Sequence, residues 1–296
     1  MMTLPNWVVA FCALAGAASI LAVASQPQPA SAQSAKDPVK KKTGYAPVNG
    51  LKMYFEITGE GMPAIYIHPV VGHGGQIPGL TKNRQWIAMD LQGHGRTADI
   101  DRPMTCEQHA DDIAALLKHL KIEQADFFGD SLGGTIAVMM AVRHPKLVRR
   151  VVSYGGKRAP YAGSAADRPP ADADFVKWFR EEYQMVAPDP KQWPTLFDKA
   201  TKSLFAWKGF MSGQLKGIKA PVLIACGDHD LIPVEHCAEW SRVIPNAQLA
   251  VIPDAGHFVL FSEPEKLLPI VAAFLDAPTP KVPIGTHNGY YPGVTR

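Results

Sequence analysis

The sequence predicts an α/β fold with a mostly parallel, twisted sheet, and three observations carry this prediction. Between residues 45 and 276, short apolar runs bounded by turn residues alternate with amphipathic helical stretches. Such alternation is typical of βαβ units, in which helices cover both faces of a parallel sheet. The first two strand signals flank Asn49-Gly50, a pair typical of the type I′ turn of an antiparallel hairpin. With 47% apolar residues, the chain can fill a large core.

The expected elements follow in order along the chain. Strands are predicted at residues 45–48, 51–58, 64–68, 85–89, 126–129, 148–154, 222–226 and 248–252. The clearest helix begins after Thr105, because Thr105 and Gln108 have the spacing of a capping box. Apolar residues then repeat at helical spacing from Ile113 to Leu120. A further helix is expected over 135–143.

The first 32 residues are expected to lie outside the folded domain. No charged residue occurs from Trp7 to Ala24, and Ala30-Ser31-Ala32 has the A-x-A pattern of a cleavage site. These features predict a secretory signal peptide cleaved near Ala32, and therefore a periplasmic or secreted protein that meets the membrane only through this leader. The n-region has no Lys or Arg, so an uncleaved membrane anchor is the alternative.

The rest of the chain divides into one domain and two tails. Residues 33–44 are predicted to form a polar linker, 45–276 the folded domain, and 277–296 a flexible tail rich in Pro and Gly. From about 157 to 220 the strand–helix alternation is interrupted, which indicates a short helical cap inserted in the domain. Nine aromatic residues fall within residues 171–210 of this stretch: Phe175, Trp178, Phe179, Tyr183, Trp193, Phe197, Phe205, Trp207 and Phe210. They are expected either to line an apolar pocket or to attach the cap to the core.

Charge and cysteine content exclude several function classes. The chain has 30 Lys+Arg against 27 Asp+Glu, a net charge of +3 without the clustering that nucleic-acid binding needs. After removal of the leader three cysteines remain, Cys106, Cys226 and Cys237, so one disulfide can form and one thiol stays unpaired. The histidines lack metal-ligand spacing, and no phosphate-binding loop is present. We therefore expect no metal and no cofactor.

One motif indicates nucleophilic catalysis. Gly129-Asp130-Ser131-Leu132-Gly133 is a G-x-S-x-G sequence between an expected strand and an expected helix. A serine on such a sharp turn exposes its hydroxyl, and the flanking glycines let strand and helix approach closely. The N–H of Leu132, at the start of the helix, can donate to a developing oxyanion. Ser131 is the predicted nucleophile.

An activated serine needs a histidine base and a carboxylate that orients it. Gly227-Asp228-His229-Asp230 follows the strand at 222–226, and Gly256-His257 follows the strand at 248–252. Both lie at carboxyl ends of strands, where the sites of open α/β sheets assemble. His257 is the predicted base, and both Asp228 and Asp230 are candidates for the acid.

With these motifs the sequence resembles the α/β-hydrolase superfamily over about residues 45–276, in particular its small esterase-like and haloperoxidase-like members. The segment from Asp90 to Arg96 is similar to the D-x-x-G-x-G turn that follows the family's fourth strand. The family's G-x-x-D pattern implies that Asp230 is the acid, with Asp228 as the alternative. The resemblance also implies a helical cap in the position of the interruption described above.

The expected oxyanion loop departs from the family pattern. The usual His-Gly-x reads His68-Pro69-Val70 here, and proline has no N–H to donate. The resemblance implies that the N–H of Val70, together with that of Leu132, forms the oxyanion hole. Only 16 residues, 69–84, separate His68 from the next expected strand, so a truncated first crossover helix is expected, with either a more open site or a weakened oxyanion hole.

These residues predict a serine hydrolase that cleaves a carboxylic ester or lactone through an acyl-enzyme. The aromatic cap and the absence of an arginine cluster favour an uncharged, partly hydrophobic small molecule as substrate. Alternatives on the same triad are a perhydrolase or haloperoxidase-type enzyme and a hydrolase of carbon–carbon bonds or amides. A non-catalytic binding protein with this fold is the alternative from another class, motivated by Pro69. The sequence leaves the oligomeric state open.

Overall fold

The computed structural model describes residues 41–75, 83–160, 170 and 173–278. The expected signal peptide and most of both expected tails lie outside these residues. The strands are β1 (Lys41–Val48), β2 (Leu51–Thr58), β3 (Met62–Ile67), β4 (Arg84–Met89), β5 (Ala125–Asp130), β6 (Val148–Tyr154), β7 (Val222–His229) and β8 (Ala247–Gly256). The helices are α1 (Cys106–His119), α2 (Leu132–Arg143), α3 (Asp174–Val186), α4 (Trp193–Ala206), α5 (Ser212–Lys216), α6 (Val234–Val243), α7 (Val259–Ser262) and α8 (Pro264–Asp276). Two short 3-10 turns, η1 (Pro145–Leu147) and η2 (Pro190–Gln192), complete the set.

The strands form one eight-stranded sheet in the order β1-β2-β4-β3-β5-β6-β7-β8. β2 pairs antiparallel with β1 and with β4, and the other neighbours are parallel. The hairpin turn has the predicted positive φ angles, 47° at Asn49 and 87° at Gly50. The α/β class with a leading antiparallel hairpin is therefore confirmed.

β1 begins earlier than expected. Lys41 pairs with Thr58 in the register of the hairpin, so residues 41–44 of the predicted linker belong to the sheet. The Nζ atom of Lys41 lies 2.6 Å from Oε2 of Glu56. A polar segment is stable at this position because β1 is an edge strand and its exposed side chains remain in water.

The helix predicted after Thr105 forms as α1. The hydroxyl of Thr105 accepts a hydrogen bond from the backbone N of Gln108 at 3.1 Å. The reciprocal half of the capping box is absent, because the Gln108 amide donates to Oδ1 of Asp112 at 3.3 Å instead. One of the two expected cap interactions is thus enough to start this helix.

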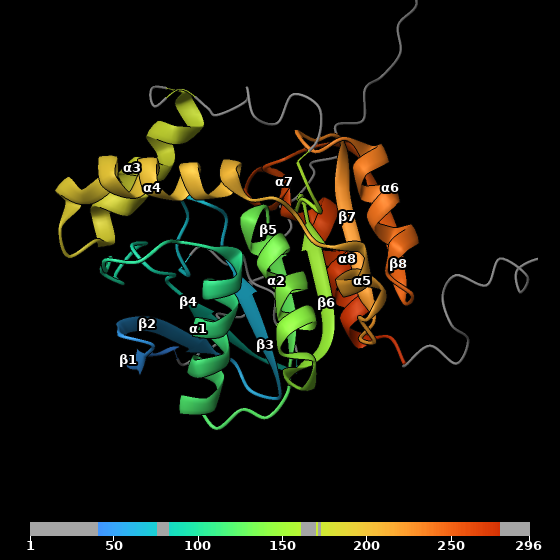
Figure 1. Cartoon of the computed structure of the whole chain (residues 1–296), viewed down its shortest axis with the longest axis horizontal. Helices are drawn as coiled ribbons and strands as arrows, with labels where there is room; N and C mark the ends of the chain where they lie inside the picture. The colour runs from blue at the N-terminus through green and yellow to red at the C-terminus, as the bar shows by residue number, and fades with distance from the viewer. Residues whose placement is uncertain (1–40, 76–82, 161–169, 171–172, 279–296) are drawn as a thin grey trace, which may run out of the picture. The chain divides into compact units, whose positions relative to one another are not determined.

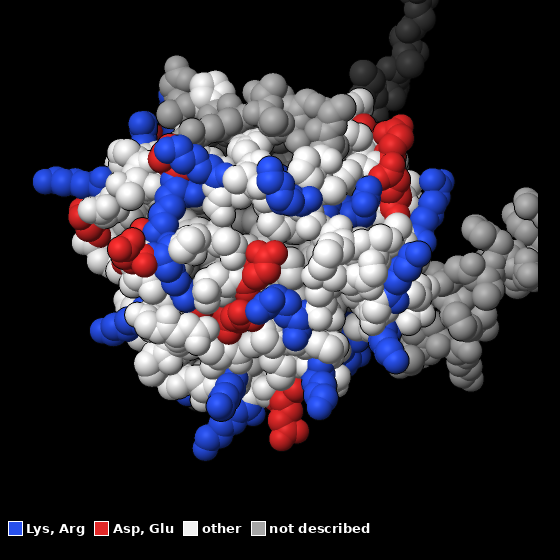
Figure 2. All heavy atoms as spheres, viewed as in Figure 1, with Lys and Arg blue, Asp and Glu red and all other residues white. Residues whose placement is uncertain are grey.

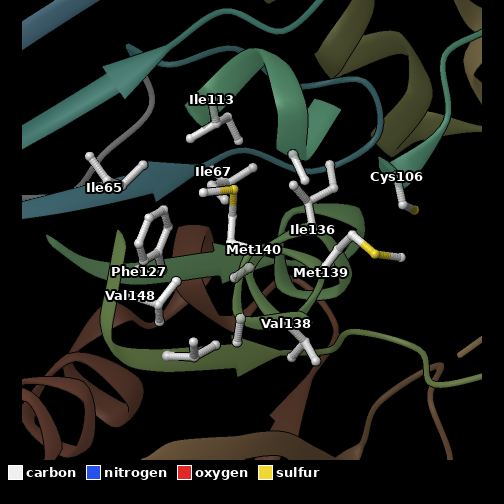
Figure 3. Packing of buried hydrophobic residues seen from close by; sticks show 14 of the residues in the cluster. Ile65, Ile67, Cys106, Ile113, Phe127, Ile136, Val138, Met139, Met140 and Val148 are labelled. Carbon is white, nitrogen blue, oxygen red and sulfur yellow. The ribbon is translucent and has the colours of Figure 1, made fainter. Parts of the chain in front are cut away.

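Apolar cores lie on both faces of the sheet. α1, α2, α5 and α6 cover one face, where Ile113, Ile136 and Met140 pack against Ile65, Ile67 and Phe127 (Figure 3). α7 and α8 cover the other face, with Leu267 and Phe274 packed against Phe128 and Val152. Because strands buried on both faces need apolar residues on both sides, β3 is a continuous apolar run, and the middle of β5 supplies Phe127 to one core and Phe128 to the other.

The connection from β3 to β4 contains no helix among residues 68–75 and 83. The rest of the segment 69–84, for which a truncated crossover helix is expected, lies outside the described residues. Between β6 and β7 the chain instead forms α3, α4 and α5, and α3 and α4 extend across the ends of the central strands (Figure 1). The helices that overhang the sheet thus come from the segment expected to form the cap.

The three cysteines in the described part of the chain are free, buried thiols. Cys226 lies in β7 and Cys237 in α6, and a hydrogen bond to Cys226, together with burial, raises the pKa of the Cys237 thiol. Charges of both signs are scattered over the face shown in Figure 2. None of the helices in the described residues is both long and apolar enough to cross a membrane.

Candidate active site

Ser131 sits on the turn between β5 and α2 with strained backbone angles, φ 56° and ψ −119°. Two glycines make this turn possible. A Cβ added to Gly129 would lie 2.0 Å from the carbonyl oxygen of Gly133, and one added to Gly133 would lie 2.0 Å from that of Ile67. Positive φ at a non-glycine residue costs ~1–3 kcal/mol, which the surrounding packing must offset. The turn presents the serine at the carboxyl end of the sheet.

The structure brings Ser131, His257 and Asp230 together. Nε2 of His257 lies 3.0 Å from Oγ of Ser131, and Nδ1 lies 2.6 Å from Oδ1 of Asp230. Since a carboxylate accepts, the Nδ1 hydrogen points to Asp230 and leaves Nε2 free to accept from the serine hydroxyl. The three groups form a hydrogen-bonded chain that can deprotonate the serine as it attacks.

The loops that carry the base and the acid are fixed by their neighbours. Oδ1 of Asp230 also accepts from the backbone N of Ile232 at 2.9 Å, which holds the carboxylate in place. The Tyr154 hydroxyl donates to the carbonyl of Gly256 at 2.5 Å, next to His257. Three strand ends, those of β5, β7 and β8, therefore supply the three groups.

The structure separates the two candidate acids. The Asp230 side chain is fully buried, whereas that of Asp228 is 41% exposed. Asp228 accepts from the backbone N of Ala255 at 3.1 Å, and this and other backbone hydrogen bonds lower its pKa. Asp228 thus shapes the loop, and Asp230 is the carboxylate that contacts His257.

The environment favours the protonated form of His257. Burial lowers the pKa of this histidine, but the hydrogen bond and charge of Asp230 and the charge of Asp130 outweigh it and raise the pKa overall. Asp130 itself is buried directly before the nucleophile, and burial raises its pKa to about 7. Sequence reasoning missed Asp130 as a functional group because its burial cannot be inferred from its place in the motif.

The two expected oxyanion donors lie on facing loops. Val70 and Leu132 both line the cavity that contains Ser131. Leu132 is the first residue of α2, so its N–H has no partner within the helix. Pro69 is tolerated because only its carbonyl oxygen takes part in hydrogen bonds that hold the loop. This oxygen accepts from the backbone N of Gly72 at 3.0 Å and from Nδ1 of His68 at 2.7 Å.

Two buried histidines support the oxyanion loop. Nε2 of His68 accepts from the backbone N of Leu91 at 3.1 Å, so its proton resides on Nδ1. Burial lowers the pKa of His68 well below its usual value, in accord with a neutral ring. Nε2 of His94 lies 2.7 Å from the carbonyl oxygen of Val70. The loop after β3 is thereby tied to the turn after β4.

A cavity of about 260 Å³ opens onto Ser131 and His257. Its wall is mostly apolar, and several residues come from the cap. The cap residues in the wall are Phe175, Val176, Phe179, Phe197, Thr201, Leu204 and Phe205. Four of the nine aromatic residues singled out from the sequence thus line the cavity. Others, such as Trp207 and Phe210, pack into the core.

Lys157 is a cavity residue that the sequence analysis did not identify. It lies in the wall together with Thr135, and its residue is 7% exposed. The only sequence signal is its position directly after Gly155-Gly156, where β6 has just ended at the active-site edge of the sheet. In sequence alone such a lysine is indistinguishable from a solvated one.

Within the described ranges no group of three or more His, Cys, Asp or Glu residues could hold a metal ion. The site described above consists of side chains, backbone N–H groups and an apolar wall.

Comparison with known proteins places this geometry in a family. Residues 61–192 match the family described as alpha/beta hydrolase fold. The AB hydrolase superfamily protein YisY of Bacillus subtilis (strain 168) is 29% identical over 258 residues, which span 75% of this chain and 94% of YisY.

Two solved structures share the fold. A thermophilic esterase from Thermogutta terrifontis, solved with malate bound, has a TM-score of 0.62 at 22% identity, over 80% of this chain and 98% of the esterase. Est816, described as an N-acyl homoserine lactone degrading enzyme, has a TM-score of 0.61 at 25% identity, over 79% of this chain and all of Est816. The family and these relatives support hydrolase activity. Together with the sheet order and the turn at Ser131, they show that the chain has the α/β-hydrolase fold.

Proposed function

We propose that this protein is a serine hydrolase that cleaves a carboxylic ester or lactone through an acyl-enzyme. The observation that carries the proposal is the hydrogen-bonded chain from Asp230 through His257 to Ser131, at the wall of a mostly apolar cavity. The same three groups on unrelated folds perform acyl transfer, because each supplies one requirement of the reaction. The likeness to an esterase and to a lactone-degrading enzyme supports the choice of an oxygen ester.

In the proposed first step the Ser131 hydroxyl attacks the carbonyl carbon while its proton passes to Nε2 of His257. Asp230 holds the imidazole in the required tautomer and stabilises the imidazolium that forms. His257 then returns the proton to the leaving alcohol, so the acyl group remains on Ser131. Water, deprotonated by His257, attacks the acyl-enzyme and releases the carboxylic acid.

The negative charge of each tetrahedral intermediate needs donors on the carbonyl oxygen. The N–H groups of Leu132 and Val70 are the proposed donors, and the N-terminus of α2 adds the positive end of the helix dipole. Removing one donor of this kind in other enzymes lowers kcat by about 10²–10³-fold. We therefore expect kcat to depend on the position of the Val70 N–H, and so on the geometry of its loop.

The cavity favours small substrates. Its volume of about 260 Å³ is slightly below the usual range of small-molecule sites, which is roughly 300 to 1,000 Å³. Acetyl to pentanoyl esters and small lactones are therefore the first substrates to try.

The test is hydrolysis of p-nitrophenyl acetate and p-nitrophenyl butyrate by the wild type and by Ser131→Ala. We expect turnover by the wild type and at least a thousandfold lower kcat for the variant, since the nucleophile is lost. A fluorophosphonate probe should label the wild type at Ser131. A folded wild type that neither turns over these esters nor reacts with the probe would favour the non-catalytic binding protein instead.

A further inference from the structure

Lys157 is a basic residue in the wall of the catalytic cavity. Its Nζ donates to the carbonyl of Leu204 at 2.6 Å and lies 5.4 Å from the centroid of the Phe205 ring. Leu204 and Phe205 line the same cavity as Ser131 and His257. The ammonium group is thus held against two cap residues that also belong to the cavity wall.

The backbone of Lys157 is tied to the helix that carries the nucleophile. Its N–H donates to Oγ1 of Thr135 at 3.0 Å, and that hydroxyl contacts the Lys157 carbonyl at 3.3 Å. The N–H of Thr135 in turn donates to the carbonyl of Ser131 at 3.2 Å. One helical turn therefore fixes the backbone of Lys157 relative to that of Ser131, and Leu204 holds the end of the lysine side chain.

The ammonium lacks a carboxylate partner in the part of the chain that the structure describes. Its ionisable neighbours are the Cys106 thiol, at the start of α1, and the imidazole of His236 in α6. Burial lowers the pKa of Lys157. A buried charge is costly unless it is paired. An ammonium has three donors and Leu204 takes one, so donors remain for an incoming group.

We propose that Lys157 binds a carboxylate of the substrate, so that the natural substrate is an ester or lactone that carries one free carboxylate on a short spacer. The inference rests on the proposed function. One lysine in a mostly apolar wall matches one negative charge, and the apolar part of the wall matches the spacer. This replaces the uncharged substrate expected from the sequence, where nothing distinguished Lys157 from a surface lysine.

The experiment compares substrates that differ only in the terminal group. On the acyl side, the mono-p-nitrophenyl ester of glutaric acid is paired with p-nitrophenyl pentanoate. On the alcohol side, 4-acetoxybutanoate is paired with butyl acetate. The wild type should show a higher kcat/KM for the carboxylate member of at least one pair. In Lys157→Met the ratio within that pair should fall by about 10- to 100-fold, the size expected for a lost hydrogen bond between charged groups.

The ratio of kcat/KM for the two members of a pair is measured within one variant, so any general loss of activity in that variant cancels. Lys157→Arg keeps the charge and should keep the preference, and Lys202→Met, which removes an exposed lysine of α4 paired with Asp198, should leave the ratio unchanged. A measurement without variants adds a second test: glutarate should inhibit hydrolysis of p-nitrophenyl pentanoate more strongly than pentanoate does.

Equal kcat/KM within both pairs, equal inhibition by the two acids, or an unchanged ratio in Lys157→Met would overturn the proposal, provided that Ser131-dependent turnover of the neutral esters persists. Loss of all Ser131-dependent turnover would instead refute the proposed hydrolase function. The two failures are therefore distinguishable.

Discussion

Nε2 of His94 lies 2.7 Å from the carbonyl oxygen of Val70, and its Nδ1 lies 2.8 Å from the carbonyl oxygen of Gln92. Both partners are acceptors, so only an imidazolium can donate to both. Burial lowers the pKa of His94 despite these two hydrogen bonds, so the neutral ring donates to one carbonyl at a time. The position of the expected oxyanion donor Val70 thus depends on this buried ring.

Replacing His94 with alanine should therefore loosen the Val70 loop. We expect kcat to fall about tenfold, less than the loss of an oxyanion donor itself. The measurement is steady-state hydrolysis of p-nitrophenyl butyrate, with His119→Ala, an exposed residue at the end of α1, as the matched control. If both variants keep wild-type kcat, the Val70 loop does not depend on His94.

The acid can be identified by two matched substitutions. Asp230→Asn should lower kcat by about 10³–10⁴-fold, because the amide favours the wrong tautomer of His257. Asp228→Asn should retain most of the activity, because that side chain accepts from the backbone N of Ala255 in β8 and does not contact His257. The two kcat values measured side by side decide the matter. A larger loss in Asp228→Asn would assign the acid to the other residue.

Asp130 should shift the pH profile of the enzyme. His257 must be neutral to accept the serine proton, so the acidic limb of kcat/KM follows its pKa. The charge of Asp130 contributes to the raised pKa of His257, so Asp130→Asn should move the acidic limb to lower pH. Asp174→Asn, at an exposed position of α3, should leave the limb in place. A limb that moves to higher pH in Asp130→Asn would contradict this reasoning.

The same carboxyl predicts a pH dependence of stability. Burial raises the pKa of Asp130 from its usual value to about 7. An acid whose pKa is raised by folding favours the folded state when protonated, and this contribution disappears as the pH rises through the folded-state pKa. Asp130→Asn, which stays neutral, should therefore raise the Tm more at pH 8 than at pH 5. An equal change at both pH values would mean that Asp130 does not titrate in this window.

Two glycine substitutions test the packing of the nucleophile turn. Gly133→Ala would place a Cβ 2.0 Å from the carbonyl oxygen of Ile67, so we expect a loss of stability of more than ~2 kcal/mol or no soluble protein. Gly213→Ala in α5 meets nothing within 4 Å and should be stabilising by up to ~1 kcal/mol. Urea unfolding of both variants measures the contrast. Equal stability of the two would show that the β3–α2 contact can relax.

Much of the fold could be predicted because its signals are local. Asn49-Gly50 specifies a turn through its backbone angles, and the run from Gly129 to Gly133 specifies another. The remaining elements depend on contacts with segments far away in the sequence. Residues 41–44 look like a linker in isolation, yet they pair with β2 because a partner strand is available.

The candidate site was predictable where residue type and strand order coincide, as at Ser131 and His257. It was not predictable where burial decides the role. Asp130 and Lys157 are charged residues that sequence statistics place in solvent. Only the arrangement of the sheet and cap buries Asp130 near His257 and puts Lys157 in the cavity wall. The choice between Asp228 and Asp230 likewise depended on which carboxylate turns inward.

The hydrogen bonds from Ser131 through Thr135 to Lys157 tie the backbones of the nucleophile and of the lysine to the first turn of α2. The ammonium at the other end of the lysine side chain is held by the carbonyl of Leu204 in α4. The distance between the nucleophile and the proposed anion site is therefore set jointly by the sheet-and-helix scaffold and by the cap. A substitution that shifts α4 should thus change the preferred length of the spacer as well as the bulk that fits.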